Sequence, residues 1–161
     1  STFHTFSIMS IVSRLMEMGV PQSIITASLI GIVSSRLVRS ICPHCKTEYT
    51  LNEIERSYFN EFPKDVIFYK GVGCEKCRNT GYLGRTGIFN IVTFDDEVKL
   101  FVTERHTDRE LLDLYARKNI KTLEQSAMSK VLQGVTTIDE VARVIGASSS
   151  TKKVDSKTLM F

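Results

Sequence analysis

Four cysteines are the residues of this chain whose type and spacing point most directly to chemistry. They form two Cys-x-x-Cys pairs, Cys42 with Cys45 and Cys74 with Cys77, and the sequence contains no fifth cysteine. A two-residue spacer lets both sulfurs of a pair reach one ion from a tight turn, and two such pairs complete a tetrahedral shell. We therefore predict a structural zinc site. Because four protein ligands leave no open coordination position, the metal would stabilise the fold and would not catalyse a reaction.

Four thiols also have uses other than binding zinc. They could hold another metal or an iron–sulfur cluster. Disulfides would require an oxidising compartment, and the first residues carry no export signal. A thioredoxin-like redox motif would explain one pair and leave the other without a role. His44 lies inside the first pair and could replace a cysteine as ligand. Since four thiolates are available, we expect His44 to be an exposed spacer.

Composition sets the class of protein. The chain has 161 residues, of which 42% are hydrophobic and 24% are charged, as in an ordinary globular protein of one domain or two small ones. Its formal net charge of +3 is weak for a nucleic-acid-binding protein. Apolar runs stay shorter than the roughly 18 to 20 residues that cross a bilayer, so we expect no membrane span. Because the sequence begins Ser1-Thr2, we expect it to be part of a longer protein.

Helices and short strands are predicted to position the cysteines. Apolar spacing predicts helices over Met9–Met18 and Gln22–Ser40, with Arg36 and Arg39 in the last turn of the second. Strands are predicted over Val66–Tyr69 and Arg85–Phe94, where β-branched and aromatic residues gather. Five further helices are predicted from their starting signals. Four begin at S/T-x-x-E/Q capping boxes, which start at Thr50, Thr107, Thr122 and Thr137, and the first of these helices would run to about Asn60. The fifth begins at Asp95 or Asp96. Together these patterns predict an α/β module held by zinc, followed by a helical bundle and a disordered tail from Ala147.

The order of particular residues resembles a known family. The chain is similar to the type II secretion and type IV pilus assembly ATPases in a series of segments that together cover about residues 1 to 145: Ser1–Thr5, Arg14–Gly19, Ala27–Val33, Arg36–Arg39, Cys42–Cys45, Gly73–Phe89, Thr122–Leu123 and Gly134–Val141. The tetracysteine block is the most specific part. Phe6 and Ser35 depart from the residues usual in the family.

This resemblance implies the end of a RecA-like P-loop ATPase domain with a zinc-binding tetracysteine insertion and a C-terminal helical bundle. Residues 1–41 would be the remnant of the ATPase domain and 42–94 the tetracysteine subdomain with short strands. Residues 95–146 would be a helical subdomain, and 147–161 a disordered tail. The family comprises hexameric, cytoplasmic ATPases that drive an inner-membrane platform, so the resemblance also implies neighbouring subunits and a platform protein as partners.

The nucleotide-binding elements of such an ATPase are not present in this sequence. It contains no G-x-x-x-x-G-K-[ST] loop, whose backbone N–H groups and lysine hold phosphates. We therefore expect ATP and Mg²⁺ to bind only in the intact parent protein, and this chain alone to be inactive. The resemblance places His4 near the γ-phosphate in the parent. In the chain as given we expect His4 to be exposed.

Several basic residues have two interpretations. Arg36 and Arg39 would contact a neighbouring subunit or nucleotide phosphates, or else remain solvated at the end of a helix. Lys76, Arg78 and Arg85 cluster around the second pair and could give a basic face for acidic lipids or an acidic partner, or a solvated turn.

Two other classes of protein remain alternatives. One is a zinc-ribbon nucleic-acid-binding module, although aromatic and basic residues do not alternate along any predicted strand as a stacking platform requires. The other is a stand-alone regulator that has acquired this zinc module.

Overall fold

The structure is a computed structural model and describes residues 8–57, 66–104 and 106–146. Two compact units divide the chain. The first contains residues up to Ser34 together with Asn90–Ile120, and the second contains Ser35–Phe89 together with residues from Lys121 onward. Each unit has its own buried apolar core.

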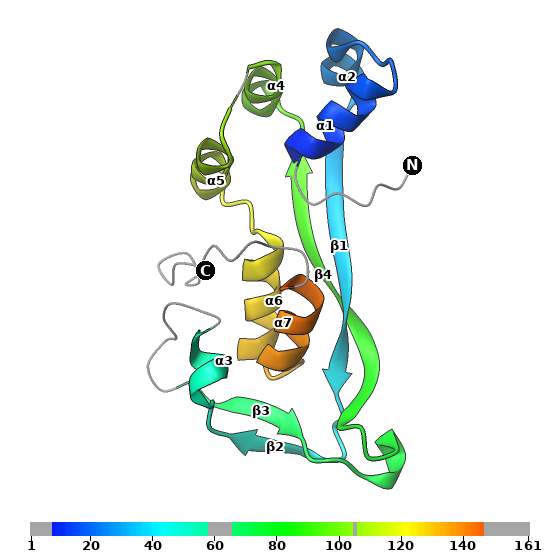
Figure 1. Ribbon diagram of the computed structural model, residues 1–161, viewed down its shortest axis with the longest axis vertical. Helices are drawn as coiled ribbons and strands as arrows, with labels where there is room; N and C mark the ends of the chain where they lie inside the picture. Colours follow the sequence, from blue (N-terminus) through cyan, green and yellow to red (C-terminus); the bar gives the residue numbers. More distant parts are fainter. Residues whose placement is uncertain (1–7, 58–65, 105, 147–161) are drawn as a thin grey trace. The chain divides into compact units, whose positions relative to one another are not determined.

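Helices surround the core of the first unit. They are α1 (Ile8–Glu17), α2 (Gln22–Ser28), α4 (Asp96–Thr103) and α5 (Asp108–Arg117), and the unit also includes one end of each of the two longest strands. Helix α1 buries Ile8, Ile11 and Val12, which its 3.6-residue period places on one face. In this part of the chain Figure 1 shows α1 beside α2, and these two helices are in contact.

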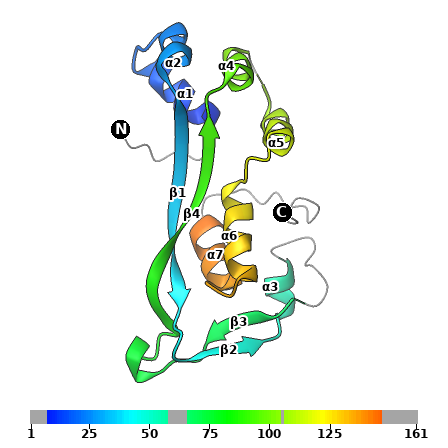
Figure 2. The same cartoon turned by 180° about the vertical axis from the view of Figure 1, so that it is seen from behind.

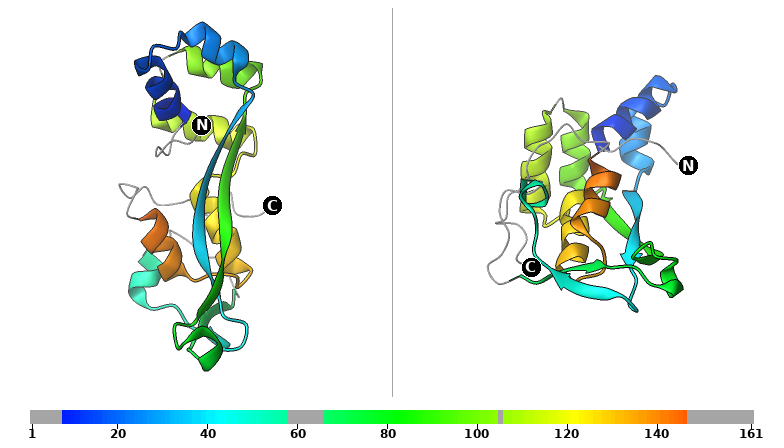
Figure 3. Two further views of the ribbon diagram at one scale, coloured as in Figure 1. Left: turned by 90° about the vertical axis from the view of Figure 1, so that its right-hand side faces the viewer. Right: turned by 60° about the horizontal axis from the view of Figure 1, so that its bottom comes forward.

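The second unit combines strands with helices. Its elements are β2 (Lys46–Tyr49), α3 (Glu53–Ser57), β3 (Phe68–Gly71), a 3-10 turn η1 (Glu75–Cys77), α6 (Leu123–Leu132) and α7 (Ile138–Ile145), with most of β1 (Gly31–Ile41) and β4 (Tyr82–Thr93). Strands β2 and β3 pair antiparallel, with Lys46 opposite Gly71 and Tyr49 opposite Phe68. Helices α6 and α7 pack side by side, as Figure 2 shows from behind. The right-hand view of Figure 3 shows β2 and β3 as neighbouring strands of one small sheet.

The predicted helix over Gln22–Ser40 is wrong. Helix α2 ends at Ser28, and Gly31–Ile41 forms β1, which is hydrogen-bonded to β4. The helix was predicted because Ile32, Val33 and Leu37 fit a helical spacing, but Val33 and Leu37 are exposed in β1. The buried residues of the strand include Ile32 and Val38, whose even separation fits the two-residue period of a strand. Pairing with β4 makes this segment a strand, and β4 comes so close at its start that a Cβ at Gly31 would lie only 3.0 Å from the carbonyl oxygen of Val92. Consequently Arg36 and Arg39 lie on a strand and not in a last helical turn.

Most other predicted elements are confirmed, with shifts at their ends. The helices expected after Asp95, Thr107, Thr122 and Thr137 are all present, and each of these side chains accepts a hydrogen bond from a backbone N–H of the first turn. The predicted strands appear as Phe68–Gly71 and Tyr82–Thr93, whereas β2 was not predicted.

The predicted capping box at Thr50 is displaced by two residues. Asn52 is the residue that caps α3: its Oδ1 accepts from the backbone N–H of Glu55 at 2.8 Å, and its own N–H donates to Glu55 Oε2 at 2.8 Å. The same reciprocal pattern therefore occurs, but with an Asn and a Glu that the S/T-x-x-E/Q search did not include.

The C-terminal helices do not share one core. Helices α4 and α5 pack in the first unit, and α6 and α7 in the second, so the predicted single helical bundle over 95–146 is divided between two cores. His4, Asn60 and residues 147–161 lie outside the described residues. Of the helices described, none combines the length and apolar character needed to cross a membrane.

Candidate metal centre

The pairing of β2 with β3 brings the two Cys-x-x-Cys loops together. Cys42 follows the last residue of β1, and Cys45 immediately precedes β2. After β3, Cys74 immediately precedes the η1 turn and Cys77 is the last residue of that turn. The N–H of Val72 donates to the carbonyl of Cys45 at 3.0 Å, which continues the β2–β3 contact into the loops. Two segments distant in the sequence thus deliver their cysteines to one place.

The four sulfur atoms have the spacing of a tetrahedral shell. The Sγ–Sγ distances are 3.9 Å from Cys42 to Cys74, 3.8 Å from Cys45 to Cys77 and 3.7 Å from Cys74 to Cys77, and all four sulfurs lie within 4.8 Å of one another. A zinc–sulfur bond of about 2.3 Å gives a tetrahedral edge of about 3.8 Å. A disulfide would need a separation of about 2.05 Å, and all four cysteines are free. The donor set therefore fits one tetrahedral, sulfur-bound ion.

Backbone turns hold the second loop in place. Gly81 has a φ of +76°, where a side chain is strained, and a Cβ at Gly81 would overlap the backbone of Gly71. The N–H of Gly81 donates to Cys77 Sγ at 3.3 Å, and the N–H of Cys74 donates to the same sulfur at 3.2 Å. Such N–H···S bonds orient the ligand and stabilise its thiolate. Glycine is therefore needed at position 81, where the backbone turns tightly, passes close to Gly71 and donates a hydrogen bond to the Cys77 sulfur.

The two buried thiols in contact have opposite pKa shifts. Burial raises the pKa of the Cys45 thiol above its usual value, because the anion loses its hydration. Burial acts in the same direction on Cys77, but the backbone hydrogen bonds from Cys74 and Gly81 outweigh it and lower the pKa of Cys77. A bound divalent ion would keep all four as thiolates.

The other residues singled out in the sequence lie at the surface or outside the described part. His44 is exposed and does not belong to the group of clustered ligand atoms. Lys76, Arg78 and Arg85 are all exposed; Lys76 and Arg78 lie in the second loop, and Arg85 lies in β4. His4 lies outside the described residues, so its expected role stays a prediction.

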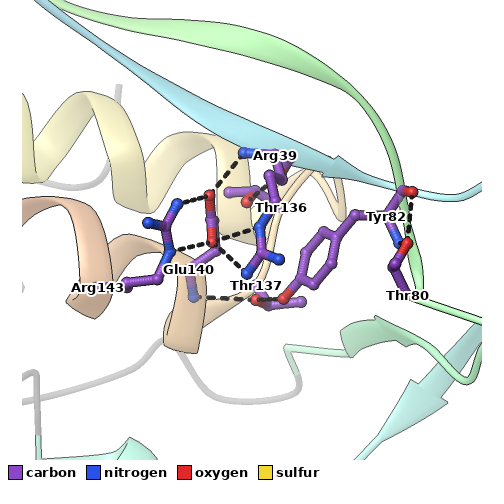
Figure 4. A network of polar contacts seen from close by, with 7 residues as sticks. All are labelled: Arg39, Thr80, Tyr82, Thr136, Thr137, Glu140 and Arg143. Atoms are coloured by element: carbon purple, nitrogen blue, oxygen red, sulfur yellow. Dashed lines mark hydrogen bonds and ion pairs between the residues drawn. The ribbon is translucent and has the colours of Figure 1, made fainter.

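A buried carboxylate near the loops was missed by the sequence analysis. The Glu140 side chain is fully buried and accepts hydrogen bonds from two arginines (Figure 4). Arg39 donates its backbone N–H at 2.9 Å and its Nε at 2.8 Å, and Arg143 donates its Nε at 2.9 Å and its Nη2 at 2.7 Å. Burial alone would raise the pKa of Glu140, but these bonds outweigh it and lower the pKa to about 2. Glu140 is therefore a paired anion at neutral pH.

Tyr82 connects this carboxylate group to the second cysteine loop. The guanidinium of Arg39 lies 4.1 Å from the centre of the Tyr82 ring, and the Tyr82 hydroxyl is 2.7 Å from the hydroxyl oxygen of Thr137. Thr137 in turn caps α7 by accepting from the N–H of Glu140 (Figure 4). Because Tyr82 directly follows Gly81, α7 and the cysteine loop are joined through a short run of contacts.

The contact between Glu140 and Arg39 could not be predicted from the sequence. Glu140 was interpreted as the fourth residue of a capping box, which would return its side chain to the Thr137 N–H. The structure keeps the Thr137 cap but directs the carboxylate to Arg39, 101 residues earlier in the sequence. No local pattern encodes a contact of that separation.

Comparisons with known proteins place this chain in one family. The model of the family described as "Type II/IV secretion system protein" matches residues 1–143. The type II secretion system ATPase E of Vibrio cholerae is 34% identical over 145 residues, which cover 89% of this chain and 29% of that protein. The type IV pilus assembly ATPase PilB of Thermus thermophilus is 40% identical over 149 residues, which cover 90% of this chain and 17% of that protein.

The class is thus that of the secretion and pilus assembly ATPases. Because the family model spans most of the sequence, the chain belongs to the type II/IV secretion system protein family. The type II secretion system protein E of Dickeya dadantii is a further relative, 37% identical over 144 residues that cover 89% of this chain. The chain spans less than a third of the length of each of these relatives. None of the three is a nucleic-acid-binding protein by name, so they lend no support to the zinc-ribbon alternative.

Proposed function

We propose that this chain is the C-terminal, zinc-binding part of a hexameric ATPase that powers type II secretion or type IV pilus extension at the inner membrane. The observation that carries the proposal is the family match over residues 1–143, with relatives named for both kinds of machine. Residues 1–41 would then end a RecA-like domain, and 42–94 would be the metal-binding insertion.

The metal in this proposal is zinc, held by Cys42, Cys45, Cys74 and Cys77. Four thiolates at tetrahedral spacing favour zinc or another thiophilic ion, and the closed shell favours a structural role. A bound ion would link the end of β1 to the η1 turn. The three buried cysteines form a cluster separate from the two apolar cores, so the ion takes the place of a core at this point.

Nucleotide chemistry belongs to the parent protein in this proposal. ATP and Mg²⁺ would bind upstream residues, with His4 near the γ-phosphate in the assembled ATPase. The present chain would not hydrolyse ATP by itself. Its contribution would be made in the cytoplasm, at the inner membrane, through contact with neighbouring subunits and with the platform protein. Lys76, Arg78 and Arg85 give the exposed basic groups for an acidic partner surface.

Elemental analysis tests the metal. We expect one zinc per chain after expression in zinc-replete medium, and no stoichiometric iron. Chelation or Cys74→Ser is expected to lower the free energy of unfolding by several kcal/mol, because metal binding and folding of the loops are coupled. His44→Ala is the matched control, since His44 is an exposed residue of the first loop and should retain both zinc and stability. An unchanged melting temperature in strong chelator would contradict the structural role.

A binding experiment tests the partner. We expect the chain to bind the cytoplasmic domain of the inner-membrane platform protein, and the triple variant Lys76→Glu, Arg78→Glu and Arg85→Glu to bind more weakly. Titration with single-stranded and duplex DNA over a series of salt concentrations is the counter-test. Salt-dependent DNA binding at physiological ionic strength, without platform binding, would favour the zinc-ribbon alternative.

A further inference from the structure

The four cysteine residues of the candidate metal centre differ in their exposure to solvent. Cys42 is fully buried, and Cys45 and Cys77 are exposed by only 9% and 5%. Cys74 is the partly exposed member of the group. Its sequence neighbours Glu75 and Lys76 are exposed, and so is Val72 two residues before it. A small molecule can therefore reach Cys74 without opening either apolar core.

Cys77 and Cys74 also differ in the number of backbone N–H groups that face their sulfurs. Cys77 Sγ accepts two backbone N–H bonds, from Cys74 and Gly81, at 3.2 Å and 3.3 Å. The Cys77 N–H faces Cys74 Sγ across the η1 turn, so Cys74 has one such neighbour. Hydrogen bonds withdraw charge from a thiolate and reduce its nucleophilicity. Cys74 therefore combines the greatest exposure with less hydrogen bonding than Cys77.

We propose that Cys74 is the site at which peroxide oxidises the metal-bound cluster, and that this modification releases the metal. The proposal rests on the proposed zinc site. In the first step the Cys74 thiolate attacks hydrogen peroxide; the O–O bond breaks, an S–O bond forms, and hydroxide leaves. Sulfur is oxidised by two electrons to a sulfenic acid, and peroxide is reduced.

The second step forms a disulfide. The Cys77 thiolate, whose Sγ lies 3.7 Å from Cys74 Sγ, attacks the sulfenic sulfur and displaces its oxygen as hydroxide. Each hydroxide takes a proton from a buffer acid, so the two steps together convert two thiolates, one peroxide and two protons into one disulfide and two waters. The ion then retains only the sulfurs of Cys42 and Cys45, and a pair of thiolates does not hold zinc as a closed shell of four does.

The consequence is confined to the loops. The β2–β3 pairing and the bonds between Arg39 and Glu140 do not involve the metal, and the core that includes α6 and α7 is separate from the cysteine cluster. Oxidation should therefore release the two loops and leave this core folded.

Trypsin separates the relevant sulfurs, which makes the order of oxidation measurable. Cleavage after Lys70, Lys76 and Arg78 places Cys74 in peptide 71–76 and Cys77 in peptide 77–78, while Cys42 and Cys45 remain together in peptide 40–46. The zinc content of the full chain is first measured by elemental analysis. Hydrogen peroxide is then added with dimedone, which traps sulfenic acid, and zinc release is followed with a chromophoric chelator.

We expect the first dimedone adduct in peptide 71–76 and loss of one zinc per chain on the same time course. Without dimedone, the expected product is peptide 71–76 linked to peptide 77–78. A first adduct in another peptide, a first disulfide to peptide 40–46, or zinc release before any adduct would overturn the proposal. His44→Ala should leave the order unchanged. A zinc content below one per chain would overturn the proposed zinc site as well, whereas full zinc with another order overturns only the role of Cys74.

Discussion

Replacing Glu140 with Gln removes a buried charge while keeping the shape of the side chain. The pKa of Glu140 falls from 4.5 to about 2 in the folded chain. Each pKa unit corresponds to about 1.4 kcal/mol, so the ionised carboxylate contributes about 3 kcal/mol at neutral pH. The side chains of Arg39 and Arg143 are 41% and 60% exposed, so they regain water when their partner is lost. We therefore expect a net cost of about 2 kcal/mol for Glu140→Gln at pH 7.

The pH dependence follows from the sign of the shift. Because the folded pKa of Glu140 lies below its unfolded value, the stabilisation is complete above about pH 4.5. It is lost as the pH falls through the interval from about 4.5 to about 2. Gln does not titrate, so the difference in stability between the wild-type chain and the variant should shrink over that interval. Both proteins lose any bound zinc alike at low pH, so the difference isolates Glu140.

Urea unfolding followed by circular dichroism measures the difference, and hydrogen exchange in α7 locates it in the second unit. The control is Glu124→Gln, the same substitution at a half-buried residue of α6 that forms no ion pair with any described residue. It should cost less than about 0.5 kcal/mol. A loss below about 1 kcal/mol for Glu140→Gln, or a loss that does not change between pH 7 and pH 3, would refute the reasoning.

Three further substitutions test other parts of the structure. Gly81→Ala should weaken zinc retention and lower the free energy of unfolding by more than about 2 kcal/mol, because its Cβ would overlap Gly71. Gly84→Ala has a similar positive φ but open space around it, so it should lower the free energy of unfolding by only about 1 kcal/mol in thermal melts. Leu114→Ala should cost about 2 to 5 kcal/mol by hydrogen exchange in the first unit, while elemental analysis finds the zinc content unchanged. Thr107→Ala should cost about 1 kcal/mol at the start of α5, and Thr107→Ser much less. Equal effects within the glycine pair or the threonine pair, or zinc loss in Leu114→Ala, would contradict these expectations.

Helix starts were predictable because their signals are local. Thr107 and Thr122 each accept a hydrogen bond from the backbone N–H of the third residue onward, whose side chain accepts from the threonine N–H in return. This reciprocal pair needs no other part of the fold. The same reasoning explains the displaced start of α3, where Asn52 offers a better cap than Thr50. The identity of β1 was not predictable in this way. Its Ile and Val residues suit a helix face or a strand, and only the neighbouring β4 makes the strand the lower-energy choice.

The sequence by itself identified the four candidate metal ligands, since the Cys-x-x-Cys spacing confines each pair of sulfurs to one turn. It also determined the family, through the residue order of segments spread over most of the chain. Tertiary structure alone decided that the two pairs meet at tetrahedral spacing, that Cys74 is the partly exposed cysteine of the four, and that Glu140 bonds to Arg39. These three properties depend on contacts between residues tens of positions apart, whose energies arise only once the strands have paired and the core has closed.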